Sequence, residues 1–536
     1  MSDSIVDDRH PLLFTNGSVL GHPPDTAVQT SDGRISDVGP VASLEAAAPS
    51  ATEHVDLAGG MLSPGFQDAH VHPPMGGLQR LRCDLEPAES LDQAIRIITD
   101  HATRGDGWLL GGGWLYRWFP SGNPPAALLD EITTRPVWLI VADGHSGWAN
   151  RSALAMAGVG ADTPDPPDGV IVRRPDGSPQ GTLHEGAMDL VERVLPADDP
   201  DDLREAILES QQYLLSLGIT AWQDAWVTPA VHDAYVDLAR SEDLRCRVRG
   251  ALVWDRTRGI EQLDELVERS HEGVGSYVPG SVKLMLDGVC ENFTASVLHP
   301  YRDEAGFPTG NRGIDFIEPG PLREIVAAID SVGMQCHFHA LGDRAVRQAL
   351  DALEHARSAN GMRDTRPHLA HLQIIDPADI ERFAQLDATA NIQPLWACAG
   401  AALTELTNPY LPLGRAELQY PFRSLVDSGA ALAMGSDWSV STPDVLQQVG
   451  VAATRTRPSM GITDPFLPEQ RIPVDTALAA FTHGSARVNF FDHDSGVIER
   501  GMRADLAVIS GDPLREDPFG LTVSMTVLDG AVAHRI

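Results

Sequence analysis

The pattern of hydrophobic and polar residues divides the chain into two β-rich ends and a long α/β middle. Both ends consist of short apolar runs broken by Asn-Gly and Asp-Gly steps, which are typical of hairpins. These runs occupy residues 11–20, 25–39 and 54–62 at one end, and 495–510 and 523–536 at the other. We expect residues 1–62 and 487–536 to form one small composite β-sandwich from both termini.

The middle, residues 63–486, alternates strand-like runs with amphipathic helical stretches such as 201–218 and 343–358. This alternation is typical of a parallel sheet built from βα units. The candidate strands are 63–72, 219–225, 247–254, 281–287, 334–340, 367–373, 389–394 and 431–437. Eight units predict an α/β fold of the (β/α)8 TIM-like barrel type, in which catalytic groups lie at the C-terminal ends of the strands. A doubly wound sheet is the alternative.

A large insertion interrupts this regular order. Residues 73–210 separate the first strand from the second, far more than a βα connection of a few residues needs. Five of the ten tryptophans lie there: Trp108, Trp114, Trp118, Trp138 and Trp148. An excursion of this size at the catalytic face would form a lid or a pocket wall. A peripheral domain with its own small core is the other interpretation.

Composition limits the possible partners and compartment. The formal net charge of −35 over 536 residues would repel nucleic acid and anionic membranes. The five cysteines are scattered and form no CxxC pair, which favours reduced thiols over disulfides or a structural zinc site. The N-terminus is acidic where a signal peptide would be basic, and no apolar run is long enough to span a bilayer. We expect a cytoplasmic protein that acts on a small molecule, with enough surface to form a homodimer.

Metal-binding side chains are found at the ends of four predicted strands. In "DAHVH", His70 and His72 share one face of a strand, and their neutral imidazoles suit a divalent metal. Later strands add, in chain order, His337 and His339, then His371, then Asp437 in "MGSDWS". At the mouth of a barrel these groups would hold one or two zinc ions. We place His337 one layer deeper than His339, as a packed histidine.

Lys283, on the fourth predicted strand, is the only lysine among the 40 lysine and arginine residues. An arginine could never lose its charge there, whereas a desolvated lysine can release its proton and react with carbon dioxide. The resulting carbamate is an anion with two oxygens that can bridge two metals. Chance survival or a structural ion pair is the alternative.

The motifs together resemble one known group of proteins. The segments "PGFQDAHVH", "SVKLMLDG", "HALGD", "AHLQ", "GSDWS" and "GVIERGMRADLAVIS" resemble the amidohydrolase superfamily. Within it, "DGHSGWANRSAL" and "GSPQGTLHEGAMDL" are similar to the amidohydrolase 3 group, which includes N-substituted formamide deformylase-like proteins. The resemblance implies a composite β-sandwich, a (β/α)8 barrel and a one- or two-zinc centre. The implied metal ligands are His70, His72, carboxylated Lys283, His339, His371 and Asp437.

The resemblance leads to a hypothesis for the reaction. A metal-activated hydroxide would cleave a C–N bond in an amide, formamide, carbamate or cyclic amide. Asp437 would carry the proton from water to the leaving amine, and His145 would donate a hydrogen bond to the developing oxyanion. Candidate substrate contacts are Trp114, Trp148, Asn150 and Glu185, although Glu185 could instead be a further metal ligand. The alternative for His145, Trp148 and Asn150 is that they are buried structural residues of the insertion. The tryptophans favour an apolar or aromatic substrate.

Two other functions stay open. A mononuclear deaminase of the same superfamily would have a similar site, but such enzymes usually supply a glutamate shortly after the fifth-strand histidine, where this chain offers Asp343. A binding protein on a metal-free hydrolase fold would have lost metal ligands, and all six are in place.

Overall fold

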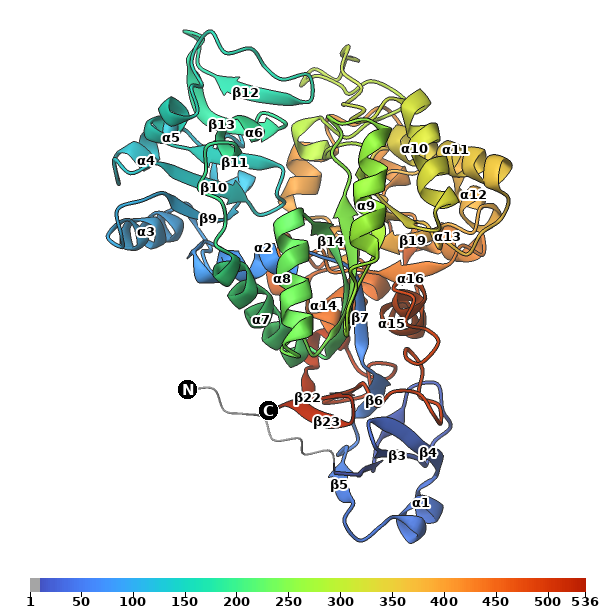
Figure 1. Ribbon diagram of the computed structural model, residues 1–536. Helices are drawn as coiled ribbons and strands as arrows, with labels where there is room; N and C mark the ends of the chain where they lie inside the picture. The colour runs from blue at the N-terminus through green and yellow to red at the C-terminus, as the bar shows by residue number, and fades with distance from the viewer. Residues whose placement is uncertain (1–9) are drawn as a thin grey trace.

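Eight parallel strands form the central sheet of the computed structural model, which describes residues 10–536 (Figure 1). The strands follow one another in chain order around the sheet, and each is hydrogen-bonded to the next. They are β7 (Phe66–Val71), β14 (Ile219–Val227), β15 (Arg247–Val253), β16 (Tyr277–Met285), β17 (Gln335–Ala340), β18 (His368–His371), β19 (Thr389–Ile392) and β20 (Leu432–Met434). The eight predicted strands and the α/β barrel are confirmed.

The first and last strands of the barrel approach each other at their C-terminal ends. The Asp437 N–H donates a hydrogen bond to the His70 carbonyl at 2.7 Å, and the His72 N–H donates to the Trp438 carbonyl at 2.7 Å. A Cβ added to Gly435 would lie 2.6 Å from the Cβ of His70, so this close approach requires glycine. The meeting of β7 and β20 therefore places candidate residues from the two ends of the barrel side by side.

The first predicted strand, 63–72, is in fact two strands in different sheets. β6 (Met61–Pro64) pairs with β21 (Leu506–Ile509) in a terminal sheet, and β7 begins only at Phe66. Gly65 lies between them, and a Cβ at this position would lie 2.4 Å from the Thr220 hydroxyl. The chain changes sheets at this glycine, and the Pro64-Gly65 step is the turn signal that the prediction of one continuous strand did not use.

Helices cover the outside of the barrel (Figure 1). α7 (Pro200–Ser216) is capped by Asp199, whose side chain accepts the Asp201 N–H, and Pro200 occupies its first position. α7 and α11 (Asp343–Asn360) confirm the helical stretches expected at 201–218 and 343–358. The helices after the insertion are α7 (Pro200–Ser216), α8 (Pro229–Arg240), α9 (Leu263–Ser270), α10 (Pro319–Ser331), α11 (Asp343–Asn360), α12 (Ile380–Gln385), α13 (Phe422–Asp427), α14 (Val445–Thr454), α15 (Val474–Ala479) and α16 (Ser485–Val488). Within residues 10–536, none of the helices has the length and apolar character that crossing a bilayer requires.

Both ends of the chain contribute to two small sheets at the opposite end of the barrel from the insertion (Figure 1). Apolar side chains of the two sheets pack into one core, which includes Phe14, Leu62 and Val527. One sheet holds β1 (Leu12–Thr15), β3 (Thr26–Ser31), β4 (Arg34–Pro40) and β5 (Glu53–Asp56), with α1 (Val41–Ala47) beside it. The other holds β2 (Ser18–Val19), β6, β21, β22 (Val523–Leu528) and β23 (Ala531–Arg535).

The insertion forms a six-stranded sheet with apolar clusters of its own. Its strands are β8 (Cys83–Asp84), β9 (Leu109–Trp114), β10 (Val137–Val141), β11 (Ser146–Ala149), β12 (Gly169–Arg173) and β13 (Pro179–Glu185). Its helices are α2 (Pro73–Leu81), α3 (Leu91–Ala102), α4 (Ala126–Asp130), α5 (Arg151–Met156) and α6 (Asp189–Glu192). The insertion has its own core, and the loop from β10 to β11 also reaches the mouth of the barrel.

Candidate metal centre

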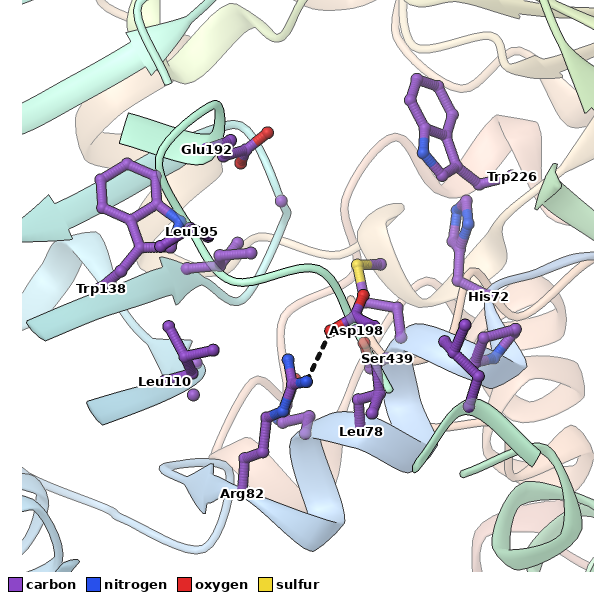
Figure 2. Close-up of a pocket in the computed structure, with 18 of the residues that line it drawn as sticks. His72, Leu78, Arg82, Leu110, Trp138, Glu192, Leu195, Asp198, Trp226 and Ser439 are labelled. Atoms are coloured by element: carbon purple, nitrogen blue, oxygen red, sulfur yellow. Dashed lines mark hydrogen bonds and ion pairs between the residues drawn. The ribbon is translucent and has the colours of Figure 1, made fainter. Parts of the chain in front are cut away.

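A cavity of about 460 Å³ lies between the insertion and the C-terminal ends of the barrel strands. The cavity is mostly apolar, with Leu110 and Trp138 on its insertion side and Trp226 facing them from the end of β14 (Figure 2). The charged side chains that also line it are Arg82, Glu192, Asp198 and Asp224. His72 lies beside Trp226 in the same view, so this first-strand histidine stands at the barrel side of the cavity.

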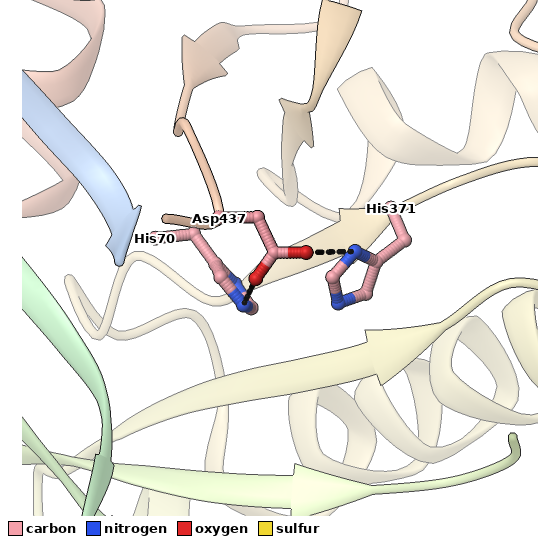
Figure 3. A group of neighbouring side chains, drawn as sticks. All are labelled: His70, His371 and Asp437. Atoms are coloured by element: carbon pink, nitrogen blue, oxygen red, sulfur yellow. Dashed lines mark ion pairs between the residues drawn. The ribbon is translucent and has the colours of Figure 1, made fainter. Parts of the chain in front are cut away.

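The Asp437 carboxylate lies among three imidazoles. Its Oδ1 is 3.3 Å from His70 Nε2 and 3.2 Å from His72 Nε2, and its Oδ2 is 3.7 Å from His371 Nδ1. Figure 3 shows the rings of His70 and His371 on either side of this carboxylate. One ligand atom from each of His70, His371 and Asp437 lies within 4.8 Å of the others. This spacing suits a single metal ion held between strands one, six and eight.

Two neighbours fix the orientation of His70. His337 Nε2 lies 2.8 Å from His70 Nδ1, which leaves Nε2 of His70 directed at Asp437. Asp68 accepts the backbone N–H of His70 at 3.0 Å and that of Ser436 at 3.0 Å, and so ties β7 to the end of β20. The structure places His337 in the interior packing position expected for it. Sequence reasoning missed Asp68, although strand alternation puts it on the face of His70.

The unpaired nitrogens of the imidazoles show that these residues fit a metal. Nε2 of His70 and both ring nitrogens of His339 and His371 are shielded from solvent without a hydrogen-bond partner in the described part of the chain. Burial lowers the pKa of His371 to about 3 and holds those of His70 and His339 well below the usual value. The rings are therefore neutral, with lone pairs that are costly to bury unpaired. A divalent metal would satisfy them.

Asp287 supports the fifth strand's histidine. Its Oδ1 lies 3.4 Å from His339 Nδ1, and its carboxylate accepts backbone N–H groups of Ser296 (2.9 Å), Leu341 (3.0 Å) and Gly342 (2.9 Å). These bonds hold the turn that follows β17 against the end of β16. Asp287 was not among the predicted site residues, although strand alternation in "KLMLD" puts it on the same face as Lys283.

Lys283 is buried inside the barrel, with 1% of its surface exposed. It lies beside His337 in the pairing of β16 with β17. Burial lowers the pKa of its ammonium group to about 7, although the negative charges of Asp437 and Asp224 oppose the shift. A large share of this side chain is therefore a free amine near neutral pH, which is the form that reacts with carbon dioxide.

The insertion brings His145 and Glu185 to the same centre. His145 Nδ1 lies 3.0 Å from Glu185 Oε2, and the His145 ring centroid lies 5.3 Å from that of His339. Burial alone would lower the pKa of His145, but the Glu185 carboxylate outweighs this effect and the pKa rises to about 9. Glu185 also accepts hydrogen bonds from Asn292 (3.0 Å) and Thr294 (2.8 Å). Glu185 thus positions a protonated His145, and its expected role as a substrate contact or further metal ligand stays a prediction.

Trp114, Trp148 and Asn150 take structural positions in place of the substrate contacts expected for them. All three are fully buried, and none lines a cavity at the centre. The Trp114 indole donates to the Leu139 carbonyl at 2.8 Å, and the two tryptophan rings pack 6.4 Å apart. Asn150 caps α5 by accepting the Ala153 N–H at 3.0 Å. These residues build the insertion, whereas Trp138 and Trp226 line the cavity.

Three residues of the centre have left-handed backbone conformations. The φ angles are 49° at Glu185, 77° at His371 and 57° at Asp437. Such angles cost about 1–3 kcal/mol at each residue that carries a side chain. The His371 N–H donates to the Gln393 side chain at 2.6 Å, and this bond helps to hold the conformation. The fold therefore aims these side chains at the expense of stability, as functional sites commonly do.

Comparison with known proteins agrees with this architecture. A family model described as "Amidohydrolase family" matches residues 53–534. "Protein LONG AFTER FAR-RED 3" of Arabidopsis thaliana is 32% identical over 544 residues, covering 96% of this chain and 90% of that protein. N-substituted formamide deformylase of Arthrobacter pascens is 27% identical over 530 residues, covering 95% and 94%.

Among solved structures, an uncharacterized metal-dependent hydrolase from Pyrococcus horikoshii has the same fold. Its TM-score is 0.74 at 23% identity, with 95% of this chain and 99% of that chain covered. The match of the family model over nearly the whole chain confirms the predicted resemblance. The protein belongs to the amidohydrolase family.

Proposed function

We propose that this protein is a metal-dependent hydrolase that cleaves the C–N bond of an amide, formamide, carbamate or cyclic amide. The observation that carries the proposal is that His70 and His371, whose neutral imidazoles have unpaired nitrogens, converge on the Asp437 carboxylate at the mouth of the barrel. Family membership supports the same reaction class, since a relative at 27% identity is an N-substituted formamide deformylase.

The metal would be one or two zinc ions. The residues that would hold it are His70, His72, His339, His371 and Asp437, with carboxylated Lys283 as a bridging anion. When bound, the metal supplies a Lewis acid that polarises the substrate carbonyl and lowers the pKa of a water molecule towards neutrality.

Asp437 is the residue placed to move protons. Burial would raise its pKa, but His72, His371 and Lys283 outweigh this effect and hold the pKa below the usual value. The carboxylate is therefore ionised at neutral pH and can accept a proton from the attacking water. It then returns this proton to the nitrogen of the leaving amine, as general acid–base catalysis requires.

His145 is the candidate donor to the substrate carbonyl oxygen. Glu185 engages Nδ1 of its ring, which leaves Nε2 for the substrate, and the raised pKa keeps the ring cationic at neutral pH. A charged donor fixed in a buried site stabilises a developing oxyanion more than a mobile one. The apolar cavity beside His72 suits an apolar or aromatic substituent of the substrate.

Metal analysis combined with a substrate panel tests the proposal. Purified protein should contain zinc and should release amines from N-formyl or N-acyl aromatic amines. Ammonia release from heterocycles by a one-metal protein, without amide cleavage, would establish a deaminase instead. A preparation that carries no metal and keeps its thermal stability in chelator would indicate a binding protein.

The charge of His145 predicts a specific pH dependence. We expect kcat/KM for a neutral amide to fall as the pH rises through about 9, because the cationic donor then loses its proton. His145→Gln should lower kcat/KM by about 10²-fold and abolish this alkaline decline. A pH–rate profile of both proteins measures the effect, and His355→Gln on the outer face of α11 is the control. An unchanged alkaline decline in His145→Gln would refute the role.

A further inference from the structure

A second cavity, of about 230 Å³, adjoins the candidate metal centre. Val141 and Ala142 line both this cavity and the larger one, so the loop after β10 separates them. The second cavity is bordered by Trp396, whose ring stacks on His371 at 5.5 Å with an interplanar angle of 8°. Both cavities therefore border the candidate centre, the larger one at His72 and the second one at Trp396 beside His371.

Two arginines without acidic partners line the second cavity. They are Arg117, in the short helix η1 (Tyr116–Trp118), and Arg457, which follows α14. Arg457 is half-buried, and its Nε is shielded from solvent without a hydrogen-bond partner in the described part of the chain. Neither guanidinium forms an ion pair within residues 10–536.

This lack of partners contrasts with two other arginines of this chain, whose formal net charge is −35. Arg247 lies 2.7 Å from Asp494, and Arg455 donates to the Phe466 carbonyl at 2.9 Å. The half-buried Arg457 guanidinium therefore has no carboxylate of this chain to neutralise it and is free to bind an anion from outside, with the exposed Arg117 on the same cavity.

The carboxyl groups of the second cavity have other partners. Asp143 accepts the His145 N–H at 3.0 Å, and Glu291 accepts the Thr407 hydroxyl at 3.1 Å. Burial raises the pKa of Glu291 to about 7, so its negative charge is reduced near neutral pH. Burial, together with the nearby charge of Arg117, also lowers the pKa of Arg457. A bound anion would compensate the desolvation of the Arg457 guanidinium and offset its repulsion by Arg117.

We propose that Arg457, assisted by Arg117, binds a carboxylate of the substrate. The substrate class is then an amide or formamide whose amine part carries a carboxylate, bound in the second cavity, and an apolar or aromatic group, bound in the larger one. Trp138 and Trp226 line the cavity for the apolar group. The identity of the cleaved bond rests on the proposed function, whereas the anion site stands on the arginines alone. A guanidinium fork matches a carboxylate with two parallel hydrogen bonds.

Two substrates that differ only in the carboxylate test this proposal. N-formylphenylalanine should have a KM at least about tenfold lower than N-formyl-2-phenylethylamine. Arg457→Met keeps the length of the side chain but removes its charge. It should raise KM for the acid by about tenfold and change KM for the neutral amide by less than about twofold. Arg96→Met, an exposed change on α3, should alter neither.

Direct binding separates the anion site from the reaction. Calorimetry with 3-phenylpropionate should show about tenfold weaker binding to metal-loaded Arg457→Met than to the wild type, with Arg457→Lys in between. Equal affinity for all three proteins overturns the proposal, as does a wild type that prefers the neutral formamide. If neither formamide is hydrolysed but 3-phenylpropionate still requires Arg457, the hydrolase assignment fails and the anion site stands. If Arg457→Met has a lower melting temperature than the wild type, the comparison is made with Arg457→Lys, which keeps the positive charge but lacks the guanidinium fork.

Discussion

Lys283→Ala should lose bound metal and lower kcat/KM by at least about 10³-fold. Lys283 is buried, is surrounded by site residues and has a pKa lowered to about 7. Alanine leaves no group there that can become an anion between metal ions. Metal content per chain and steady-state kinetics measure the two losses together.

Chemical rescue gives the sharper form of this prediction. A short carboxylic acid such as propionate should restore part of the metal and part of the activity of Lys283→Ala, because its carboxylate can enter the vacated space. Lys283→Arg should show no rescue, since a guanidinium fills the space and stays charged. The intact wild-type protein should also be heavier than its sequence by one carbon dioxide. Full turnover by Lys283→Ala would exclude the bridging role.

Asp437→Asn should lower kcat by about 10²–10⁴-fold while KM changes little. Asparagine preserves the size of the side chain and one carbonyl oxygen, but it cannot accept the proton of the attacking water. The carboxylate lies 3.2–3.7 Å from three imidazoles, so some loss of metal is also expected. Rates are therefore compared per bound metal.

Asp444→Asn provides the matched control for Asp437→Asn. Asp444 caps α14 by accepting the Leu446 N–H at 2.9 Å, and asparagine caps helices about as well as aspartate. We expect near wild-type kcat for this variant. Equal losses in both variants would mean that the Asp437 change acts through folding. An Asp437→Asn protein with full metal and full kcat would remove Asp437 from the proton transfer.

The sequence predicts the barrel well because its signal is local and repeated. Each strand is a short apolar run, and strand alternation alone puts His70 and His72 on one face. The C-terminal ends of the strands in a parallel barrel lie at one mouth. The sequence alone therefore predicts that His339, His371 and Asp437 lie close together. The switch of sheets at Gly65 was missed although the Pro64-Gly65 step signals a turn, because apolar residues on both sides of it fit one strand equally well.

The insertion is predicted less well, for a physical reason. Trp114 and Trp148 are buried by packing between strands and helices far apart in sequence, and no local pattern shows which way an indole points. The pairing of His145 with Glu185 arises from the antiparallel contact of β11 with β13, where Ser146 lies opposite His184. Both residues were predicted as site residues, but their pairing depends on the register of β11 with β13, which the sequence does not show.

The pairing of β6 with β21 has a consequence for how the chain is made. On the ribosome, Pro64 leaves the tunnel early, whereas its partner Leu506 is synthesised near the end. Until then β6 presents an unpaired edge to solvent, and such edges invite association with other chains. We expect the sheet of β6 and β21 to assemble last and nascent chains to depend on chaperones during that delay.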